Sequence, residues 1–251
     1  MTGFFTLIER EFYRFWRLFR QTVVPPVVTT LLFVLIFGYS LGSRIREISG
    51  FPYIVYILPG LIAMGVITNA YANSSTSLFM SRLERSIENI MAAPFSYLQL
   101  VTALAIGGIL RGLVVGGVTL GVALVMTPLH IQHWGLSLLA LFLLSAIFSC
   151  FGIISALYSE SWDQISTFTN FFLTPFVYLG GVFYSIRMLP GIWQKISLFN
   201  PLFYLIDLVR YAALGLSDVP LGLSLSIAVG LTLVSFAVCV WLFKIGYKLV
   251  S

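Results

Sequence analysis

Apolar residues occur along this chain in long runs, separated by short polar segments. Six of these runs have the length of a membrane-spanning helix, which needs ~20 apolar residues. They lie at 21–43, 50–81, 164–186 and 219–243, with two more inside 89–159, where Pro128 and Gly135 divide a stretch whose one charged residue is Arg111. The pattern predicts an all-α integral membrane fold with six transmembrane helices.

The composition agrees with a membrane protein. Of 251 residues, 59% are hydrophobic and 9% are charged, whereas soluble domains carry about 25% charged residues. The sequence is therefore read as one transmembrane domain over residues 1–251. The first apolar run is too long for a signal peptide and lacks its small-residue cleavage pattern, so we expect it to remain as an anchor.

The charge balance gives an orientation and excludes one class of partner. The predicted inner segments carry more Lys and Arg than the outer ones, which favours both termini in the cytoplasm. The net charge of +5 is small and forms no basic stripe, so no nucleic-acid partner is expected. Cys150 and Cys239 lie within apolar runs, which favours small core residues over a disulfide or a metal site.

Residues 4–20 have the pattern of an amphipathic helix. One face is polar (Glu9, Arg10, Tyr13, Arg14, Arg17, Arg20), and the other is apolar (Phe4, Phe5, Ile8, Phe12, Phe15, Trp16, Phe19). Glu11 is the one residue that does not fit. Such a helix lies in the headgroup plane of a bilayer, with its basic groups toward anionic lipid; a helix packed on protein is the alternative. Pro25 and Pro26 predict a turn into the first span.

A short inner helix is predicted at 82–93. Ser81 and Glu84 have the spacing of a capping box, and Pro94 ends the helix after Ala93. Ser96 and Gln99 repeat this spacing before the third span, with Phe95 and Leu100 placed as a hydrophobic staple. The charged side chains of the short helix face either a partner protein or, in a plain linker helix, water: Arg82, Glu84, Arg85 and Glu88.

The third span combines small residues with one charge. Gly108, Gly112 and Gly116 form a stripe that lets another helix approach closely, with Gly117 and Gly121 beside it. Arg111 lies deep in the same helix, where a charge costs ~2.5–3.5 kcal/mol. It needs a partner or water, and the pattern leaves open whether it pairs structurally or takes part in a conformational change.

Two spans carry polar residues at helical spacing in their inner halves. The second span has Asn69, Asn73 and Thr76, and the fifth has Thr167, Asn170 and Thr174. Hydrogen bonds between helices, worth ~0.6 kcal/mol each in a membrane, are one interpretation. The other is a vestibule that opens inward between the two spans.

Between the last two spans, residues 188–214 form two segments that are too short to span a membrane. The longer one, fourteen residues, reaches ~21 Å against a ~30 Å hydrocarbon core. We expect a re-entrant outer hairpin, with Pro190 and Trp193 in its first half and a hinge at Asn200 and Pro201. Asp207 and Arg210 pair with each other or hold a neighbouring helix. Because irregular backbone at this depth must be covered by protein or water, the hairpin is expected to roof a cavity.

Catalytic chemistry is missing from the sequence. No Asp or Glu falls within a span, and His130 and His133 have no carboxylate or thiol close to them in the sequence. None of the three lysines belongs to a phosphate-binding GK[ST] motif. We therefore expect no enzyme activity and no bound cofactor or metal. Energy for uphill transport would have to come from another chain.

Four segments resemble the ABC-2 type transporter permeases, and the likeness covers essentially the whole chain. They are PGLIAMGVITNAYAN at 59–73, ENIMAAPFSYLQLV at 88–101, GGILRG at 107–112 and LTPFVYLGGVFYSIRMLPGIWQKISLFNPLFYLIDLVRYAALG at 173–215. The likeness is strongest to short bacterial inner-membrane permeases that are encoded beside a separate ATPase.

The resemblance implies a role for each predicted element. Residues 4–20 correspond to an interfacial connecting helix, 82–93 to a coupling helix that docks on a cytoplasmic ABC ATPase subunit, and 188–214 to the re-entrant helices. Two permeases pair as a homodimer, with the second and fifth spans beside a central pathway. ATP and Mg²⁺ belong to the ATPase. Amphipathic cargo is expected for export: a lipid-linked glycan, a lipid or a hydrophobic drug. An ion-coupled secondary transporter and a membrane scaffold or enzyme subunit are the alternatives.

Overall fold

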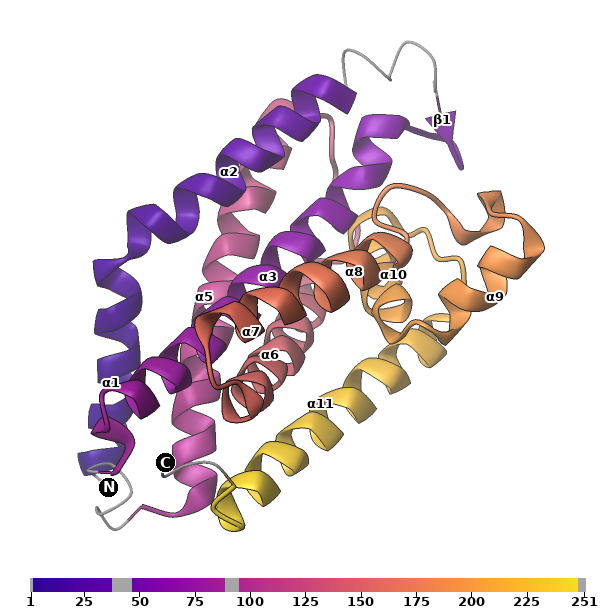
Figure 1. Cartoon of the computed structure of the whole chain (residues 1–251). Coiled ribbons are helices and arrows are strands. Elements are labelled where there is room, and N and C mark those ends of the chain that lie inside the picture. The colour runs from indigo at the N-terminus through magenta and orange to yellow at the C-terminus, as the bar shows by residue number, and fades with distance from the viewer. Residues whose placement is uncertain (1, 38–46, 89–94, 248–251) are drawn as a thin grey trace.

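The computed structural model describes residues 2–37, 47–88 and 95–247. These residues form helices, apart from loops and a two-residue antiparallel pair, β1 (Glu47–Ile48) and β2 (Phe51–Pro52). The helices lie along one elongated bundle (Figure 1). Its two ends differ: α1 (Thr2–Arg17) begins at the end where α11 (Leu221–Lys244) finishes, and β1 and α9 (Gly191–Phe199) lie at the opposite end.

Four described helices are long and apolar enough to cross a membrane: α3 (Tyr53–Leu83), α5 (Tyr97–Met126), α6 (Trp134–Tyr158) and α11. A fifth candidate is the pair formed by α1 and α2 (Phe19–Leu35), which is bent by 58°. The multi-pass helical fold is thus confirmed, with four or five spans in the described residues against the six predicted. The bend lies at Leu18, whereas Pro25 and Pro26, predicted to mark this turn, lie inside α2.

The predicted fifth span is not one regular α-helix. It is divided into α7 (Trp162–Phe168), the π-helix η2 (Thr169–Leu173) and α8 (Thr174–Leu179). Pro175 has no N–H to donate to the carbonyl four residues earlier, which removes one α-helical hydrogen bond beside η2. The hydroxyl of Thr174 instead donates to the carbonyl of Thr169 at 3.0 Å, five residues back. The helix then stops at Gly180, well before the predicted end at Ile186.

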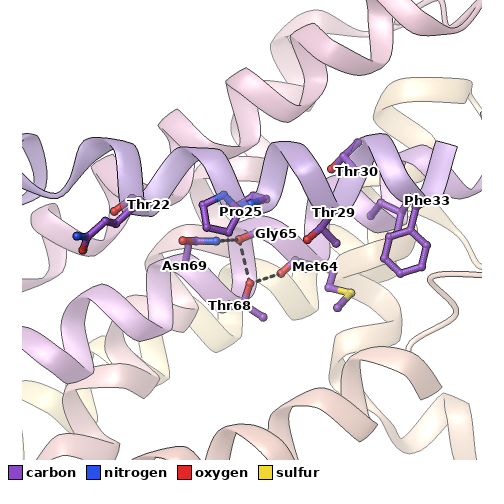
Figure 2. Close-up of a pocket in the computed structure, with 12 residues that line it drawn as sticks. Thr22, Pro25, Thr29, Thr30, Phe33, Met64, Gly65, Thr68 and Asn69 are labelled. Carbon is purple, nitrogen blue, oxygen red and sulfur yellow. Dashed lines mark hydrogen bonds between the residues drawn. The ribbon is translucent and has the colours of Figure 1, made fainter. Parts of the chain in front are cut away.

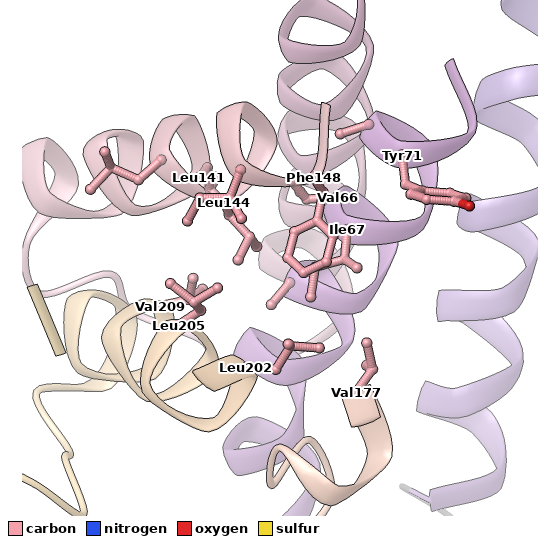
Figure 3. Packing of buried hydrophobic residues seen from close by; sticks show 14 of the residues in the cluster. Val66, Ile67, Tyr71, Leu141, Leu144, Phe148, Val177, Leu202, Leu205 and Val209 are labelled. Carbon is pink, nitrogen blue, oxygen red and sulfur yellow. The ribbon is translucent and has the colours of Figure 1, made fainter. Parts of the chain in front are cut away.

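The core is built around α3, which packs against α5 and α6. Leucine, isoleucine, valine and aromatic side chains from α3, α6, α8 and α10 (Pro201–Leu214) meet in one cluster (Figure 3). The glycine stripe of α5 faces this contact: a Cβ at Gly112 would lie 2.5 Å from the Ser145 hydroxyl and 3.2 Å from the Ala70 Cβ. The predicted close helix packing is therefore confirmed for this stripe, whereas Gly117 has nothing within 4 Å of its Cβ position.

The two short segments between α8 and α11 are α9 and α10, preceded by the 3₁₀ turn η3 (Ile186–Met188). They meet at the predicted hinge. Asn200 Oδ1 accepts from the Leu202 N–H at 3.0 Å, and Asn200 Nδ2 donates to the Phe176 carbonyl at 2.6 Å. Pro190 immediately precedes α9, and Trp193 is half exposed on it.

The helix α10 is a packed element. It contacts α3, α6 and α11, and most of its residues are buried. The expectation that the hairpin roofs a cavity stays a prediction.

Asp207 and Arg210 on α10 hold neighbouring segments, the second of the two predicted options. Asp207 accepts from the Ser217 hydroxyl at 2.7 Å and from the Asp218 N–H at 2.9 Å, which fixes the loop before α11. Arg210 donates to the Gly181 carbonyl and lies 4.5 Å from the centre of the Tyr56 ring. The ion pairs of the described residues include none between Asp207 and Arg210.

Candidate functional site

The inner end of α3 carries the residues predicted to contact a partner. The helix ends at Leu83, Glu84 and Arg85 form a turn in which Arg85 has φ 54°, and residues 86–88 are again helical. Residues 89–93, the remainder of the predicted coupling helix, lie outside the described residues. We call residues 84–88 the inner turn.

The predicted capping box at Ser81 is wrong, because α3 continues through this residue. The Ser81 hydroxyl instead accepts from Arg10 Nη2 of α1 at 3.3 Å. The second box is confirmed: Ser96 Oγ accepts from the Gln99 N–H at 3.2 Å, and Gln99 Oε1 accepts from the Ser96 N–H at 3.0 Å. The two sites differ because Ser81 meets another helix and Ser96 does not.

Three of the four predicted contact residues are free to meet a partner. Glu84, Arg85 and Glu88 are exposed. Arg82 is engaged within the chain, where its Nη1 donates to the carbonyls of Ala156 at 2.6 Å and Ser159 at 3.1 Å. The last carbonyls of a helix have no partners within that helix and carry partial negative charge, so Arg82 caps the inner end of α6.

Glu11, the misfit of the amphipathic pattern, forms the centre of the contact between α1 and α3. Its side chain is 2% exposed, and the Ser77 hydroxyl lies 2.8 and 2.9 Å from its two carboxylate oxygens. Arg10 and Arg14 pair with it at 3.2 and 3.0 Å. Two basic residues of the polar face therefore point at protein, although lipid headgroups were expected.

Arg14 extends this network further along α3. Its Nη2 donates to the Asn73 carbonyl at 3.0 Å and to Asn73 Oδ1 at 3.3 Å. Burial lowers the pKa of Arg14, an effect that Glu11 opposes and Arg10 increases. On the aromatic face, Phe5, Phe12 and Trp16 are exposed, whereas Phe15 is buried.

Arg111 of α5 reaches Asn69 of α3. Its Nη2 lies 3.4 Å from Asn69 Oδ1, while Asn69 Nδ2 donates to the Gly65 carbonyl at 3.0 Å. The Nε of Arg111 has no hydrogen-bond partner within the described residues. The intramembrane charge therefore has a structural partner, the side-chain amide of Asn69, and its part in a conformational change stays a prediction.

The two polar stripes do not meet within one chain. Asn69 and Asn73 face α1, α2 and α5, while Thr167 and Asn170 are exposed on α7 and η2. A different face of α3 contacts α7: Tyr71 stacks on Phe168 with ring centres 5.7 Å apart, and Phe79 meets Trp162 at 4.7 Å. A vestibule lined by both stripes would need a second copy of the chain.

A cavity of about 270 Å³ lies between α2 and α3 (Figure 2). Hydroxyl and amide groups line it together with proline, methionine and phenylalanine: Gln21, Thr22, Pro25, Pro26, Thr29, Thr30, Phe33, Met64, Thr68 and Asn69. We call it the α2–α3 cavity. Asn69 was predicted as a pathway residue, but the α2 residues were missed. The sequence did contain a signal for these α2 residues, because Thr22, Pro26 and Thr29 recur at helical spacing in the first apolar run.

The histidines and cysteines show no catalytic arrangement. His133 stacks on Tyr211 with ring centres 5.7 Å apart, and Cys239 Sγ lies 3.4 Å from the Cys150 carbonyl, with both cysteines buried and unpaired. Within the ranges 2–37, 47–88 and 95–247, no three His, Cys, Asp or Glu side chains are grouped to hold a metal ion.

These features define the chain as a multi-pass helical membrane protein with polar residues at the end that carries the inner turn and a hinged hairpin at the opposite end. Residues 2–214 match the family model described as "ABC-2 type transporter". The chain is also 40% identical over 242 residues to the "Inner membrane transport permease YadH" of Escherichia coli K12, covering 96% of this chain and 94% of that protein. The protein therefore belongs to the ABC-2 type transporter family, as the sequence motifs indicated, and is a multi-pass inner-membrane permease.

More distant relatives have another name. "Nodulation protein J" of Sinorhizobium fredii NGR234 is 25% identical over 181 residues, covering 70% of this chain and 68% of that protein. "Nodulation protein J" of Rhizobium meliloti 1021 is 23% identical over 227 residues, covering 86% and 83%. Similarity thus extends over most of the chain even among these relatives.

Proposed function

We propose that this chain is the permease subunit of an ATP-driven exporter. It works as a homodimer with two separate cytoplasmic ATPase subunits, which bind ATP and Mg²⁺. Both termini face the cytoplasm, and an amphipathic substrate moves outward. The family supports the kind of partner, because ABC-2 permeases work with an ATPase. A permease without a nucleotide-binding motif has to receive its energy through a contact.

The observation that carries the proposal is the connection of the inner turn to two other helices. Directly before the turn, Ser81 accepts from Arg10 of α1, and Arg82 donates to the last carbonyls of α6. A push on the exposed residues Glu84, Arg85 and Glu88 would therefore move the ends of α3 and α6 together with α1. Charge-assisted hydrogen bonds are suited to this, since they are shorter and stronger than neutral ones.

The pathway in this proposal is formed where two copies meet. Thr167 and Asn170 are polar and exposed on α7 and η2, and polar groups without partners are costly in a hydrocarbon environment. A second copy that covers α7 and η2 would remove this cost. Together with Asn69, Asn73 and Thr76 of α3, these residues would line the route.

The α2–α3 cavity supports an amphipathic substrate. Threonine hydroxyls and the Asn69 amide lie beside Pro25, Phe33 and Met64, so one surface offers both hydrogen bonds and apolar contact. Pockets that bind small molecules have this mixture of a mostly apolar lining and few polar groups. A lipid-linked glycan, a lipid or a hydrophobic drug has matching chemistry.

The proposal is tested by measuring how strongly a transport substrate stimulates ATP hydrolysis. The permease and its ATPase are reconstituted in lipid discs, and stimulation of ATP hydrolysis is measured across a ligand panel. The triple variant Glu84→Ala, Arg85→Ala, Glu88→Ala should lose stimulation by at least about fivefold, the lower end of a typical coupling free energy. Glu9→Ala removes an exposed carboxylate from α1 and should leave stimulation unchanged. Full stimulation in the triple variant would contradict the docking role of the inner turn.

A further inference from the structure

A second cavity, of about 590 Å³, lies between α1 and the inner third of α3. Arg10, Tyr13, Arg14 and Arg17 line it from α1, and Thr76 and Ser77 from α3. We call it the basic pocket. Its volume falls within the ~300–1,000 Å³ of typical ligand sites. The sequence pattern did not indicate it, because the polar face of residues 4–20 was expected to lie against a bilayer.

The basic pocket has an excess of positive charge. Arg10 and Arg14 share one carboxylate, that of Glu11. Arg17 is exposed and forms no hydrogen bond or ion pair with any described residue. Glu84, the acidic residue among those that line the pocket, is exposed at the inner turn. Three guanidinium groups beside the carboxylates of Glu11 and Glu84 leave an unneutralised cation.

The surroundings of the pocket indicate that its ligand comes from the bilayer. Next to it, the outer side of α1 exposes aromatic rings, with Trp16 61% exposed and stacked on Phe12 at a ring-centre distance of 6.2 Å. Tyr13 is 63% exposed and lines the pocket itself. Tryptophan and tyrosine concentrate at the level of lipid headgroups. Arginine beside such rings is therefore placed at the depth of lipid phosphates.

We propose that the basic pocket binds the phosphate headgroup of an anionic membrane lipid. The phosphate oxygens accept from Arg17 and from the outward N–H groups of Arg14, since the planar guanidinium matches phosphate in a two-point contact. The acyl chains lie along the aromatic side of α1. This site goes beyond the proposed function, because lipid binding here requires neither a transport direction nor an identified cargo.

Binding is tested on the full-length permease in detergent micelles by native mass spectrometry. Equal amounts of dioleoyl phosphatidic acid, dioleoyl phosphatidylglycerol and dioleoyl phosphatidylcholine are added, and the retained lipids are counted. The wild-type chain should retain the two anionic lipids in preference to phosphatidylcholine. Arg17→Gln should weaken this retention about fivefold, the contribution of one basic residue close to an anionic headgroup.

The matched control is Arg20→Gln, one turn further along the chain. Arg20 is also exposed but does not line the basic pocket, so this variant should retain anionic lipid like the wild type. Equal losses in the two variants, or no preference for anionic lipid in the wild type, would overturn the proposal. A large excess of inorganic phosphate should not displace the lipid. Displacement would overturn the assignment to a lipid headgroup in favour of free phosphate.

Discussion

At the scale of single residues, Glu11 has the largest effect on how α1 is placed. From the amphipathic pattern alone, a carboxylate on the apolar side of the helix is expected to pack poorly. The structure shows this carboxylate buried, with Ser77 as donor and two arginines as partners. Arg10 and Arg14 of the polar side are therefore directed at Glu11 and α3, whereas Phe5, Phe12 and Trp16 of the aromatic side are exposed.

We expect Glu11→Ala to destabilise the permease by about 1–3 kcal/mol, the range for leaving buried polar partners unsatisfied. The substitution removes the acceptor of Ser77 and the shared partner of Arg10 and Arg14. The effect is limited because Arg10 and Arg14 are 41% and 28% exposed and can be partly hydrated. Thermal unfolding of the purified protein in detergent measures the loss.

The control for this prediction is Glu11→Gln, which keeps an oxygen that can accept from Ser77 but removes the negative charge. It should lie between the wild type and Glu11→Ala in unfolding temperature. Unchanged thermal stability in Glu11→Ala would show that Glu11 does not hold α1 on α3.

At the scale of helices, apolar runs predicted the long elements well. The positions of α3, α5, α6 and α11 follow from apolar stretches of sufficient length, and α10 begins and ends at the predicted residues. A run of apolar residues does not reveal local backbone geometry. Beside the π-helix η2 inside the fifth run, the hydroxyl of Thr174 donates to the Thr169 carbonyl, and before the early end at Gly180 the Phe176 carbonyl accepts from Asn200.

The glycine stripe of α5 gives a prediction at this scale. A Cβ at Gly108 would overlap the hydroxyl oxygens of Ser74 and Ser149, which are 2.6 Å apart in their own hydrogen bond. Gly108→Ala should therefore cost about 1–3 kcal/mol through overpacking. Thermal unfolding in detergent measures this cost.

Gly117→Ala is the matched control, since nothing lies within 4 Å of its Cβ position. Alanine is the better helix former by up to about 1 kcal/mol, so this variant should be as stable as the wild type or more stable. A Gly108→Ala protein that unfolds at the wild-type temperature would refute the close contact of α5 with α3 and α6.

The candidate site was harder to predict than the helices. Charged residues at 82–88 and the polar stripes were visible in the sequence, but their partners come from distant segments. Ser81 was predicted to cap a helix, but its hydroxyl accepts from Arg10 of α1 instead. Arg82 caps α6 by donating to the carbonyl of Ala156, which is 74 residues away in the sequence. The spacing of residues within one helix carries no information about such contacts.

At the scale of the whole molecule, the inner end combines three features. The inner turn is exposed, its base is bonded to α1 and α6, and the α1–α3 contact beside it is fixed by Glu11. At the opposite end, Asp207, Asn200 and Arg210 tie the hairpin to the loop before α11 and to the segment after η2. In our proposal, force enters at the first end and the pathway opens at the second.

The most direct measurement of this claim is site-specific photocrosslinking in the complete complex. Arg85→Cys places a thiol on the inner turn, and the native Cys150 and Cys239 are buried, so a benzophenone maleimide reacts selectively at position 85. Lys195→Cys on α9, at the opposite end, is the control. We predict a covalent adduct between permease and ATPase subunit after illumination at position 85 and none at position 195. Absence of the adduct at position 85 in a complex that purifies intact would contradict the claim.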